Sequence, residues 1–292
     1  MTHDPGPVRI GEFGRRVGVS PDLLRAWERR YGLLRPVRSP GGFRLYTAED
    51  AARVSRMRQA LGDGLSAAEA AGIALADEPS ASREGFPPDA VARLLASIRA
   101  YDEPGVHAVL DEELAAFRLD VVLRDLVLPT LRQVGLEWQQ GTLDISHEHF
   151  ASHVLRGRLL ALGRLWGRGS GPLALLACAP GEEHDLGLIA FGLVLRSYGW
   201  RILLLGADTP VATLVHAAET TRPALTVVTS VEPARLEAEA PALRGLADLV
   251  PLVLAGPGAS DAVCAQVGVS RLDGDLVAAA GEVASGYLFE KR

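Results

Sequence analysis

Residues 173–187 read LALLACAPGEEHDLG and contain a short apolar run, a polar loop and the start of an apolar helix. A continuous apolar run of this length is typical of a strand that is buried on both faces of a parallel sheet. Three more such runs, 201–207, 224–230 and 249–256, alternate with amphipathic helical segments. This alternation predicts a Rossmann-like, doubly wound parallel sheet over residues 169–292.

Ligands of such sheets lie beyond the carboxyl ends of the strands, so the loops after these runs should carry the chemistry. In the first loop, Glu182, His184 and Gly187 are spaced as Glu-x-His-x-x-Gly, where the strand gives way to a helix. A neutral imidazole is a good metal ligand, and a neighbouring carboxylate orients the ring and raises its basicity. Either Glu182 or Asp185 could supply that carboxylate, while Gly187 lets the backbone approach a ligand closely.

This loop resembles the base-off, His-on cobalamin-binding motif, which implies that His184 ligates cobalt at the lower face of the corrin ring. That family also has a Ser-x-Leu-like element and a Gly-Gly pair beside the nucleotide tail of the cofactor. By this resemblance, the expected cofactor contacts extend to Thr229, Ser230, Val231, Gly256 and Gly258. These later residues also fit ordinary turns at strand ends, and on their own they favour that interpretation.

Residues 90–168 form a second unit, in which four segments carry apolar residues at spacings of three and four. This periodicity, with short connections, predicts an antiparallel four-helix bundle. Pro129 falls inside the third helix, and its missing N–H predicts a kink there. The stretch 75–89, LADEPSASREGFPPD, is rich in proline, serine and charge, and is the predicted linker to the N-terminal unit.

The N-terminal unit, residues 1–74, opens with two short helices that a turn at Gly18 separates. Ser20 is placed to cap the second helix and Pro21 to occupy its first turn. A helix-turn-helix of this kind predicts a second helix that enters the DNA major groove. Gly41-Gly42 then forms the predicted tip of a hairpin, which is suited to carrying phosphate contacts on its flanks.

Residues 23–46, LLRAWERRYGLLRPVRSPGGFRLY, resemble the winged helix-turn-helix of the MerR family. The resemblance implies a double-stranded DNA operator as partner, with contacts from Arg25, Arg29, Arg38, Arg44 and Tyr46. Trp27 and Tyr31 fit core packing at least as well as DNA contact, and Glu28 is expected to orient an arginine. Charge agrees, since residues 8–58 contain twelve arginines against five acidic residues, a balance of +7, which leaves −13 for the rest of a chain of net charge −6.

The bundle adds Trp138 and, after nine intervening residues, Glu148-His149, which resembles the signature of the CarH-type photoreceptor repressors. The resemblance implies that adenosylcobalamin is the cofactor and that the bundle covers its upper face. It further implies that light breaks the cobalt–carbon bond, and that a homo-oligomer, a dimer or tetramer, releases DNA. Gln139 departs from the family, which commonly has a histidine directly after the tryptophan. His147, His149 or His153 could substitute, and His149 and His153 share a helix face on which a separate metal site is the less favoured hypothesis.

Two cysteines, Cys178 and Cys264, exclude a disulfide framework and are expected to be buried and reduced. No signal peptide or membrane span is apparent, so we expect a cytoplasmic regulator without enzymatic activity. Two alternatives stay open: a regulator that senses cobalamin, redox state or haem without light, and a component of a cobalamin enzyme. The second is disfavoured because 292 residues leave no room for a separate substrate barrel.

Overall fold

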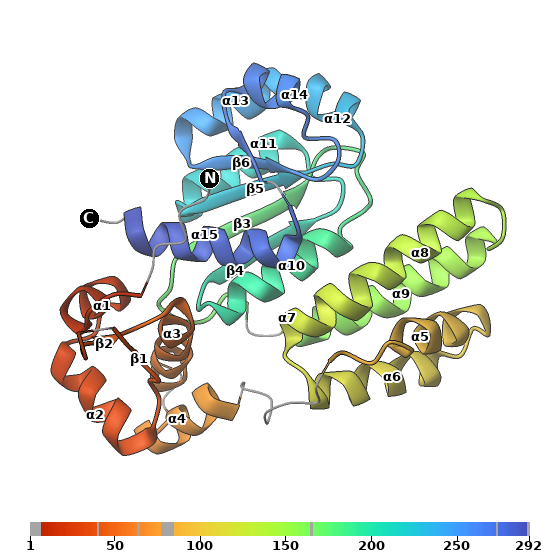
Figure 1. Cartoon of the computed structure of the whole chain (residues 1–292). Coiled ribbons are helices and arrows are strands. Elements are labelled where there is room, and N and C mark those ends of the chain that lie inside the picture. Colours follow the sequence, from red (N-terminus) through yellow and green to blue (C-terminus); the bar gives the residue numbers. More distant parts are fainter. Residues whose placement is uncertain are drawn as a thin grey trace.

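The computed structural model describes residues 7–39, 41–62, 65–76, 85–163, 166–272 and 274–290. The predicted linker, 75–89, falls mainly on residues 77–84, which lie outside the described residues. Three units follow one another along the chain: a helical N-terminal head, a helical bundle and an α/β unit (Figure 1). In the described part of the chain, no helix is both long and apolar enough to cross a membrane.

The head begins with α1 (Ile10–Val17) and α2 (Pro21–Tyr31), and the predicted cap is present because the Ser20 hydroxyl accepts a hydrogen bond from the Leu23 N–H. A hairpin follows, formed by β1 (Val37–Arg38) and β2 (Arg44–Leu45), which pair antiparallel. Helices α3 (Ala48–Gly62) and α4 (Ala67–Ala76) complete the unit. Its small core includes Trp27, which is 5% exposed and therefore a packing residue.

The bundle consists of α5 (Ala90–Arg99), α6 (Glu103–Ala116), a third long helix and α9 (Ile145–Leu162). The third helix has three parts: α7 (Leu119–Val122), a π-helical turn η1 (Leu123–Val127) and α8 (Leu128–Gln139). Pro129 lies just after the π turn, where the widened hydrogen-bond pattern accommodates a residue that lacks an N–H. The irregularity that Pro129 predicts is thus a π turn on its N-terminal side.

The α/β unit has a five-stranded parallel sheet in the order β4-β3-β5-β6-β7. Its strands are β3 (Leu173–Cys178), β4 (Arg201–Gly206), β5 (Leu225–Thr229), β6 (Leu252–Ala255) and β7 (Ser270–Arg271). Its helices are α10 (Leu186–Ser197), α11 (Val211–Thr221), α12 (Pro233–Ala238), α13 (Ala240–Leu249), α14 (Asp261–Val267) and α15 (Leu276–Glu290). The predicted fold class is confirmed, with the two-residue strand β7 as an addition at the sheet edge.

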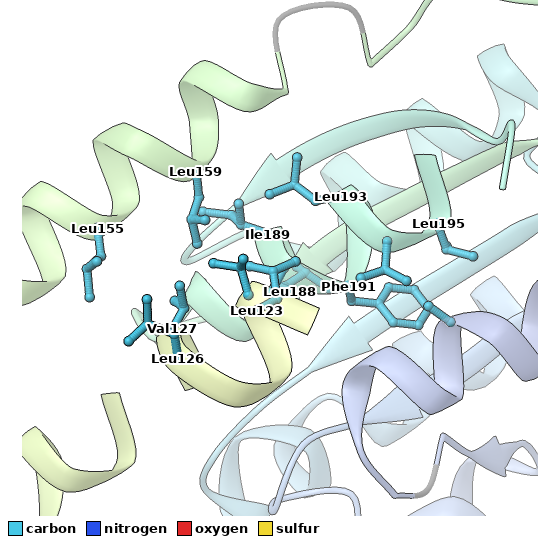
Figure 2. Close-up of a cluster of buried hydrophobic side chains, with 14 of the residues drawn as sticks. Leu123, Leu126, Val127, Leu155, Leu159, Leu188, Ile189, Phe191, Leu193 and Leu195 are labelled. Carbon is cyan, nitrogen blue, oxygen red and sulfur yellow. The ribbon is translucent and has the colours of Figure 1, made fainter. Parts of the chain in front are cut away.

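The bundle and the α/β unit share one continuous apolar core. Figure 2 shows leucines of α9 and η1 meeting apolar side chains of α10, with Leu155 and Leu159 on one side and Leu188 and Ile189 on the other. Since this packing involves the C-terminal half of α9, that half of the bundle is anchored on the sheet. The loop that joins α8 to α9 lies at the opposite end of these helices (Figure 1).

The head also contacts the α/β unit directly. A Cβ atom added to Gly199 would lie 2.6 Å from the Cβ of Ser55 in α3, so the two backbones approach more closely there than a side chain permits. Gly199 precedes β4, and helix α1 of the head likewise lies beside α15. The N-terminal head is therefore docked on the same unit that carries the Glu182–His184 loop.

Candidate functional site

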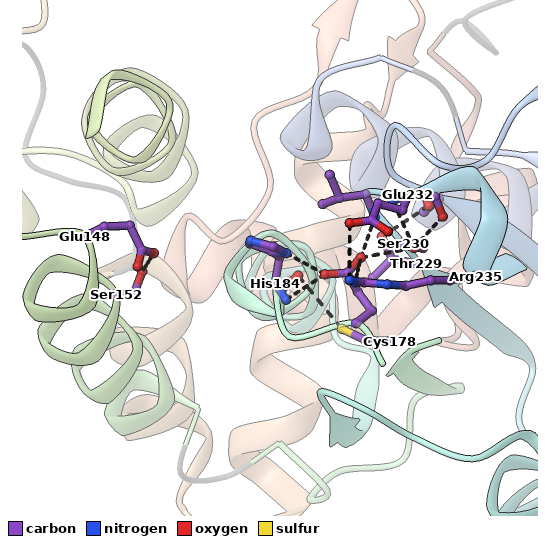
Figure 3. A network of polar contacts seen from close by, with 11 residues as sticks. Glu148, Ser152, Cys178, His184, Thr229, Ser230, Glu232 and Arg235 are labelled. Atoms are coloured by element: carbon purple, nitrogen blue, oxygen red, sulfur yellow. Dashed lines mark hydrogen bonds and ion pairs between the residues drawn. The ribbon is translucent and has the colours of Figure 1, made fainter. Parts of the chain in front are cut away.

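Glu182 is the centre of the network that follows β3. Its partners His184, Ser230 and Arg235 are labelled in Figure 3. Its carboxylate is fully buried, and Oε1 lies 2.5 Å from Nδ1 of His184 and accepts the His184 N–H at 2.9 Å. Oε2 accepts hydrogen bonds from the Ser230 hydroxyl at 3.0 Å and the Val231 N–H at 2.7 Å. The Arg235 guanidinium completes the set, with Nη1 2.8 Å from Oε2.

This network keeps Glu182 ionised. Burial alone would raise the pKa of Glu182, but hydrogen bonds from the Val231 and His184 N–H groups, the His184 ring and Ser230 outweigh it and lower the pKa to about 2. The imidazole of His184 is fixed through Nδ1, while 68% of its side chain remains exposed. Nε2 is therefore the ring nitrogen available to a metal.

Asp185 has a different partner, which resolves the choice between the two carboxylates. Its carboxylate is 2% exposed and forms a bidentate ion pair with Arg156 of α9, with a shortest N–O distance of 2.7 Å. Glu182, and not Asp185, holds the His184 ring. The sheet end thus carries two buried carboxylates, each neutralised by an arginine from another element.

A cavity of about 500 Å³ opens beside His184 between the carboxyl ends of the strands. Its lining includes five of the residues predicted as cofactor contacts: His184, Gly187, Thr229, Val231 and Gly256. A Cβ atom at Gly256, whose φ is +83°, would lie 2.6 Å from the Thr229 hydroxyl oxygen. Only glycine fits this close approach of the two loops, at a backbone angle that other residues rarely adopt.

Ser230 and Gly258 lie behind the cavity rather than in its lining. The Ser230 hydroxyl donates to Glu182, and the Gly258 N–H donates to the Ser230 carbonyl at 2.9 Å. A Cβ atom at Gly258 would lie 2.8 Å from the Glu232 carbonyl. These two residues shape the loops that support His184.

The His184 donor set fits a cobalt ligand, and the cavity beside it fits the nucleotide tail of a corrinoid. Its volume lies within the usual range of small-molecule pockets, and most of its lining is apolar, with polar side chains from His184, Thr229 and Arg271. An imidazole with one nitrogen buried against a carboxylate and the other exposed is the arrangement that a metal ligand requires.

The opposite side of the site is formed by the bundle. Figure 3 shows Glu148 and Ser152 to one side of His184, with Ser230, Glu232 and Arg235 on the other. The Ser152 hydroxyl donates to the half-buried Glu148 carboxylate at 2.7 Å. Trp138 is 44% exposed at the end of α8, and the side chain of His149 is 73% exposed. In the described part of the chain, none of these residues lines the cavity beside His184.

The other bundle histidines differ in their surroundings. His147 stacks on Tyr101 with ring centroids 4.3 Å apart, and its Nδ1 lies 3.1 Å from the Tyr101 hydroxyl. His153 is exposed, as is Gln139. Among the described residues, no group of three or more histidine, cysteine or acidic side chains is arranged to hold a metal ion. Both cysteines are buried thiols, and burial raises the pKa of the Cys178 thiol to about 12.

A second concave surface lies on the head, between α2 and the hairpin. A groove of about 440 Å³ is lined by all five predicted DNA contacts: Arg25, Arg29, Arg38, Arg44 and Tyr46. The four arginines are exposed, and Arg38 and Arg44 are direct partners across the hairpin. The groove therefore combines helix α2, the β1–β2 hairpin (the wing) and concentrated positive charge. This arrangement suits contact with a DNA duplex.

Buried and acidic residues support this groove from below. Glu28 lies 3.1 Å from Nε of Arg44 and accepts a hydrogen bond from the Tyr46 hydroxyl at 2.8 Å, so it orients an arginine as expected. Tyr46 is only 2% exposed and stacks on Phe13, which makes it part of the groove floor. Arg9, whose guanidinium lies over the Phe43 ring at 4.1 Å, also lines the groove.

Three functional candidates escape the sequence patterns: Arg9, Arg156 and Arg235. Arg9 directly precedes the first helix of a basic segment, which is a weak signal. Arg156 and Arg235 reach their carboxylates from 29 and 53 residues away in sequence, as the residue numbers show. No local spacing connects such pairs, so the folded chain is needed to find them.

Comparisons with known proteins agree with this division of the chain. Residues 8–76 match the family described as MerR HTH family regulatory protein, and residues 90–162 match the one described as B12 binding domain. The monomethylamine corrinoid protein of Methanosarcina barkeri aligns with a TM-score of 0.57 at 19% identity, over 69% of this chain and 100% of its own. That likeness shows the fold of the bundle and α/β unit.

Two curated relatives extend across the units. The HTH-type transcriptional repressor CarH of Myxococcus xanthus is 37% identical over 226 residues, which cover 74% of this chain and 76% of CarH. The HTH-type transcriptional repressor CarA of the same organism is 35% identical over 261 residues, which cover 87% of this chain and 88% of CarA. The chain therefore belongs to the family of HTH-type transcriptional repressors that includes CarH and CarA.

Proposed function

We propose that this chain is a repressor whose grip on a DNA operator is controlled by adenosylcobalamin bound between the bundle and the α/β unit. The observation that carries the proposal is His184, with Nδ1 fixed by a buried Glu182 and the rest of its ring exposed beside the cavity. The same chain presents an arginine-lined groove on a docked head. A cofactor site and a DNA site are thus joined in one molecule.

Residues of the α/β unit would hold the lower face of the cofactor. His184 would bind cobalt through Nε2, because Glu182 engages Nδ1 and remains ionised. Gly187, Thr229, Val231 and Gly256 would enclose the nucleotide tail, since they line the cavity next to that ring. Asp185, Ser230 and Gly258 would act by shaping the loops and would not touch the cofactor.

Residues of the bundle would cover the upper face. Trp138, Glu148 and His149 are the proposed contacts to the adenosyl group, and the exposure of Trp138 leaves its ring free to pack against a ligand. Adenosylcobalamin, when bound, would supply a cobalt–carbon bond that visible light breaks. Loss of the adenosyl group would remove the contacts with Trp138. The position of the bundle over the site would then no longer be favoured.

The DNA-facing part of the proposal rests on the head. Arg25 and Arg29 on α2 would reach base edges or phosphates in the major groove, and Arg38 and Arg44 would contact phosphates from the wing. Tyr46 would contribute indirectly, through Glu28 and Arg44. A dimer or tetramer would strengthen binding by raising the effective concentration of a second head. We assign no catalytic residue.

The proposal is tested in three steps with the full chain. An absorption spectrum of the protein mixed with adenosylcobalamin in the dark reports binding. Electron paramagnetic resonance of bound cob(II)alamin then identifies the lower ligand, because ¹⁵N-labelled protein gives a two-line splitting if histidine is bound, whereas ¹⁴N of the cofactor's own base gives three. Operator affinity and molecular mass in the dark and after green light complete the test. Equal values in both conditions would rule out light control.

A second candidate function is favoured by Gln139. An amide oxygen is a poor ligand for cobalt(III) compared with imidazole, so this chain lacks the usual upper-side replacement after light. A regulator that distinguishes cobalamin forms without light is the resulting alternative. Adenosyl-, methyl- and hydroxocobalamin compared in the dark separate the two, because a light-independent sensor changes its DNA affinity with the form supplied and ignores illumination. A haem sensor would show a Soret band in the same spectrum.

A further inference from the structure

We propose that the Arg156–Asp185 ion pair is the joint that ties the position of the bundle to the loop of the cobalt ligand, with Arg156 as a positioning residue. This inference rests on the proposed function, because it identifies the contact that couples the upper and lower sides of the proposed cofactor site. Arg156 belongs to α9 of the bundle, and Asp185 directly follows His184. The pair therefore connects the two units at the residue next to the metal ligand.

The geometry of the pair is specific. Nε of Arg156 lies 3.0 Å and 2.9 Å from the two carboxylate oxygens of Asp185, and Nη2 lies 2.7 Å from Oδ2. Such a two-pronged contact fixes orientation as well as distance, which a single point charge does not. Asp185 is 2% exposed, whereas about half of the Arg156 side chain is exposed. The carboxylate is thus buried and depends on this partner.

Asp185 pairs with Arg156 instead of capping its own helix. It occupies the N-cap of α10, a position at which an aspartate normally accepts hydrogen bonds from the first N–H groups of the helix. Here its side chain makes no capping hydrogen bond, and the carboxylate reaches the bundle instead. By contrast, the Ser20 hydroxyl at the N-cap of α2 accepts a hydrogen bond from the Leu23 N–H of its own helix.

The place of Arg156 along α9 explains what the joint controls. Leu155 and Leu159 lie in the apolar core that α9 shares with α10, as Figure 2 shows. Hydrophobic contacts are not directional, so this packing does not by itself fix the orientation of α9. Ser152 and Glu148 lie one and two turns towards the N-terminus on the same helix face as Arg156. The ion pair therefore stands between the anchored half of α9 and the half that is proposed to cover the cofactor.

Movement of the bundle would act on the loop through this pair. If α9 shifts away from the α/β unit, Asp185 is left as a buried charge without its partner, which is a costly state. The alternative is that residue 185, and with it the backbone of His184, moves with α9. Either response links the position of the bundle to the geometry below the cofactor.

The experiment compares R156Q, D185N and the double variant R156Q/D185N with R158Q as the matched control. Arg158 lies two residues further along α9, but its ion pair with Asp111 stays inside the bundle. For each protein, operator affinity is measured with and without adenosylcobalamin in the dark, together with the spectrum that reports histidine ligation. We expect R156Q to reduce the cofactor-dependent change in DNA affinity by about tenfold and to retain the histidine-bound spectrum, because the Glu182 network is intact.

The double variant checks that the two residues act together. We expect R156Q/D185N to lose no more coupling than R156Q, and R158Q to match the wild type. An unchanged coupling in R156Q, or an equal loss in R158Q, would overturn the joint. R156K is the conservative variant: lysine keeps the charge without the fork, so it should restore only part of the coupling.

A measurement on the cofactor-free protein separates this inference from the proposed function. Hydrogen exchange of the amides in residues 183–189 should be about tenfold faster in R156Q than in wild type or R158Q, because the loop has lost its partner in the bundle. If the wild type does not bind adenosylcobalamin, the proposed function fails while this result still decides whether the joint exists. If exchange is the same in all three proteins, the joint is absent even if the cofactor binds.

Discussion

The two sides of the proposed cofactor site differ in how much of their geometry is set without a ligand. Below the site, Glu182 receives hydrogen bonds from Ser230, Val231 and His184 and an ion pair from Arg235, and its side chain is fully buried. Above it, Trp138 and His149 are exposed, and the Glu148 carboxylate accepts a hydrogen bond from its own helix.

This difference separates two tasks. The His184 ring is already held in one orientation by Glu182, so little conformational entropy is lost when a metal binds. The lower side therefore favours high affinity. On the upper side, Trp138 and His149 are exposed and Glu148 is bonded to Ser152 of its own helix. These side chains would gain most of their further contacts from the ligand, so the upper side should change most when that ligand changes. We therefore expect variants below the site to affect whether cobalamin binds, and variants above it to affect which form is preferred.

The largest effect is expected from H184A. Removal of the imidazole takes away the proposed cobalt ligand, so cobalamin affinity should fall by at least about 100-fold, the upper end of what the loss of a supporting residue causes. Spectroscopic titration with hydroxocobalamin measures the change. H216A, on α11 of the same unit, is the control. Comparable affinity in H184A and wild type would mean that the prepared lower side is not a metal site.

Acid should reveal the free energy stored in the lower network. The pKa of Glu182 is lowered from 4.5 to about 2 in the folded protein, so its contribution to stability is complete above pH 4.5 and is lost as the pH falls towards 2. By pH 3 about 2 kcal/mol should be lost. Urea unfolding of wild type and E182Q at pH 7 and pH 3 measures this. A stability difference between the two proteins that does not change with pH would show that the network stores no such free energy.

On the upper side, W138A should have a smaller and more selective effect. Trp138 offers a large aromatic surface that is 44% exposed, so its loss should reduce the preference for adenosylcobalamin over hydroxocobalamin by about tenfold and leave hydroxocobalamin affinity nearly unchanged. L136A is a suitable control, because Leu136 is similarly exposed on the opposite face of α8. An equal loss of affinity for both forms would remove the distinction between the two sides.

The same contrast explains what the sequence can and cannot predict. Strand β3 and the Glu-x-His-x-x-Gly loop are readable because apolar run length and local spacing determine them. The sequence cannot predict whether Glu182 or Asp185 bonds to the His184 ring, since this depends on which carboxylate faces the ring after the backbone turns. Arg156 and Arg235 are hidden among many arginines, and their pairing arises only when α9 and α12 pack against the loop.

Fold details follow the same rule. The two-residue strand β7 has too short a pattern to be recognised, and its pairing with β6 comes from the sheet rather than from its own sequence. The π turn before Pro129 likewise reflects how a helix adjusts to a proline when its two halves are both packed. Tyr46 belongs to a motif associated with DNA binding, but its burial against Phe13 depends on the tertiary contact between hairpin and α1.

The smallest effect, and the sharpest test of the upper side, is expected from Q139H. Gln139 is exposed at the end of α8, next to Trp138, and an imidazole there would provide a ligand that the amide does not. If the upper side is as adaptable as its exposure indicates, Q139H should raise the fraction of corrinoid that remains bound after illumination and gel filtration by about threefold. Q140H places the same side chain one residue further and should leave retention unchanged. Equal retention in wild type, Q139H and Q140H would mean that residue 139 does not reach the ligand, and that the bundle covers the site in a different register.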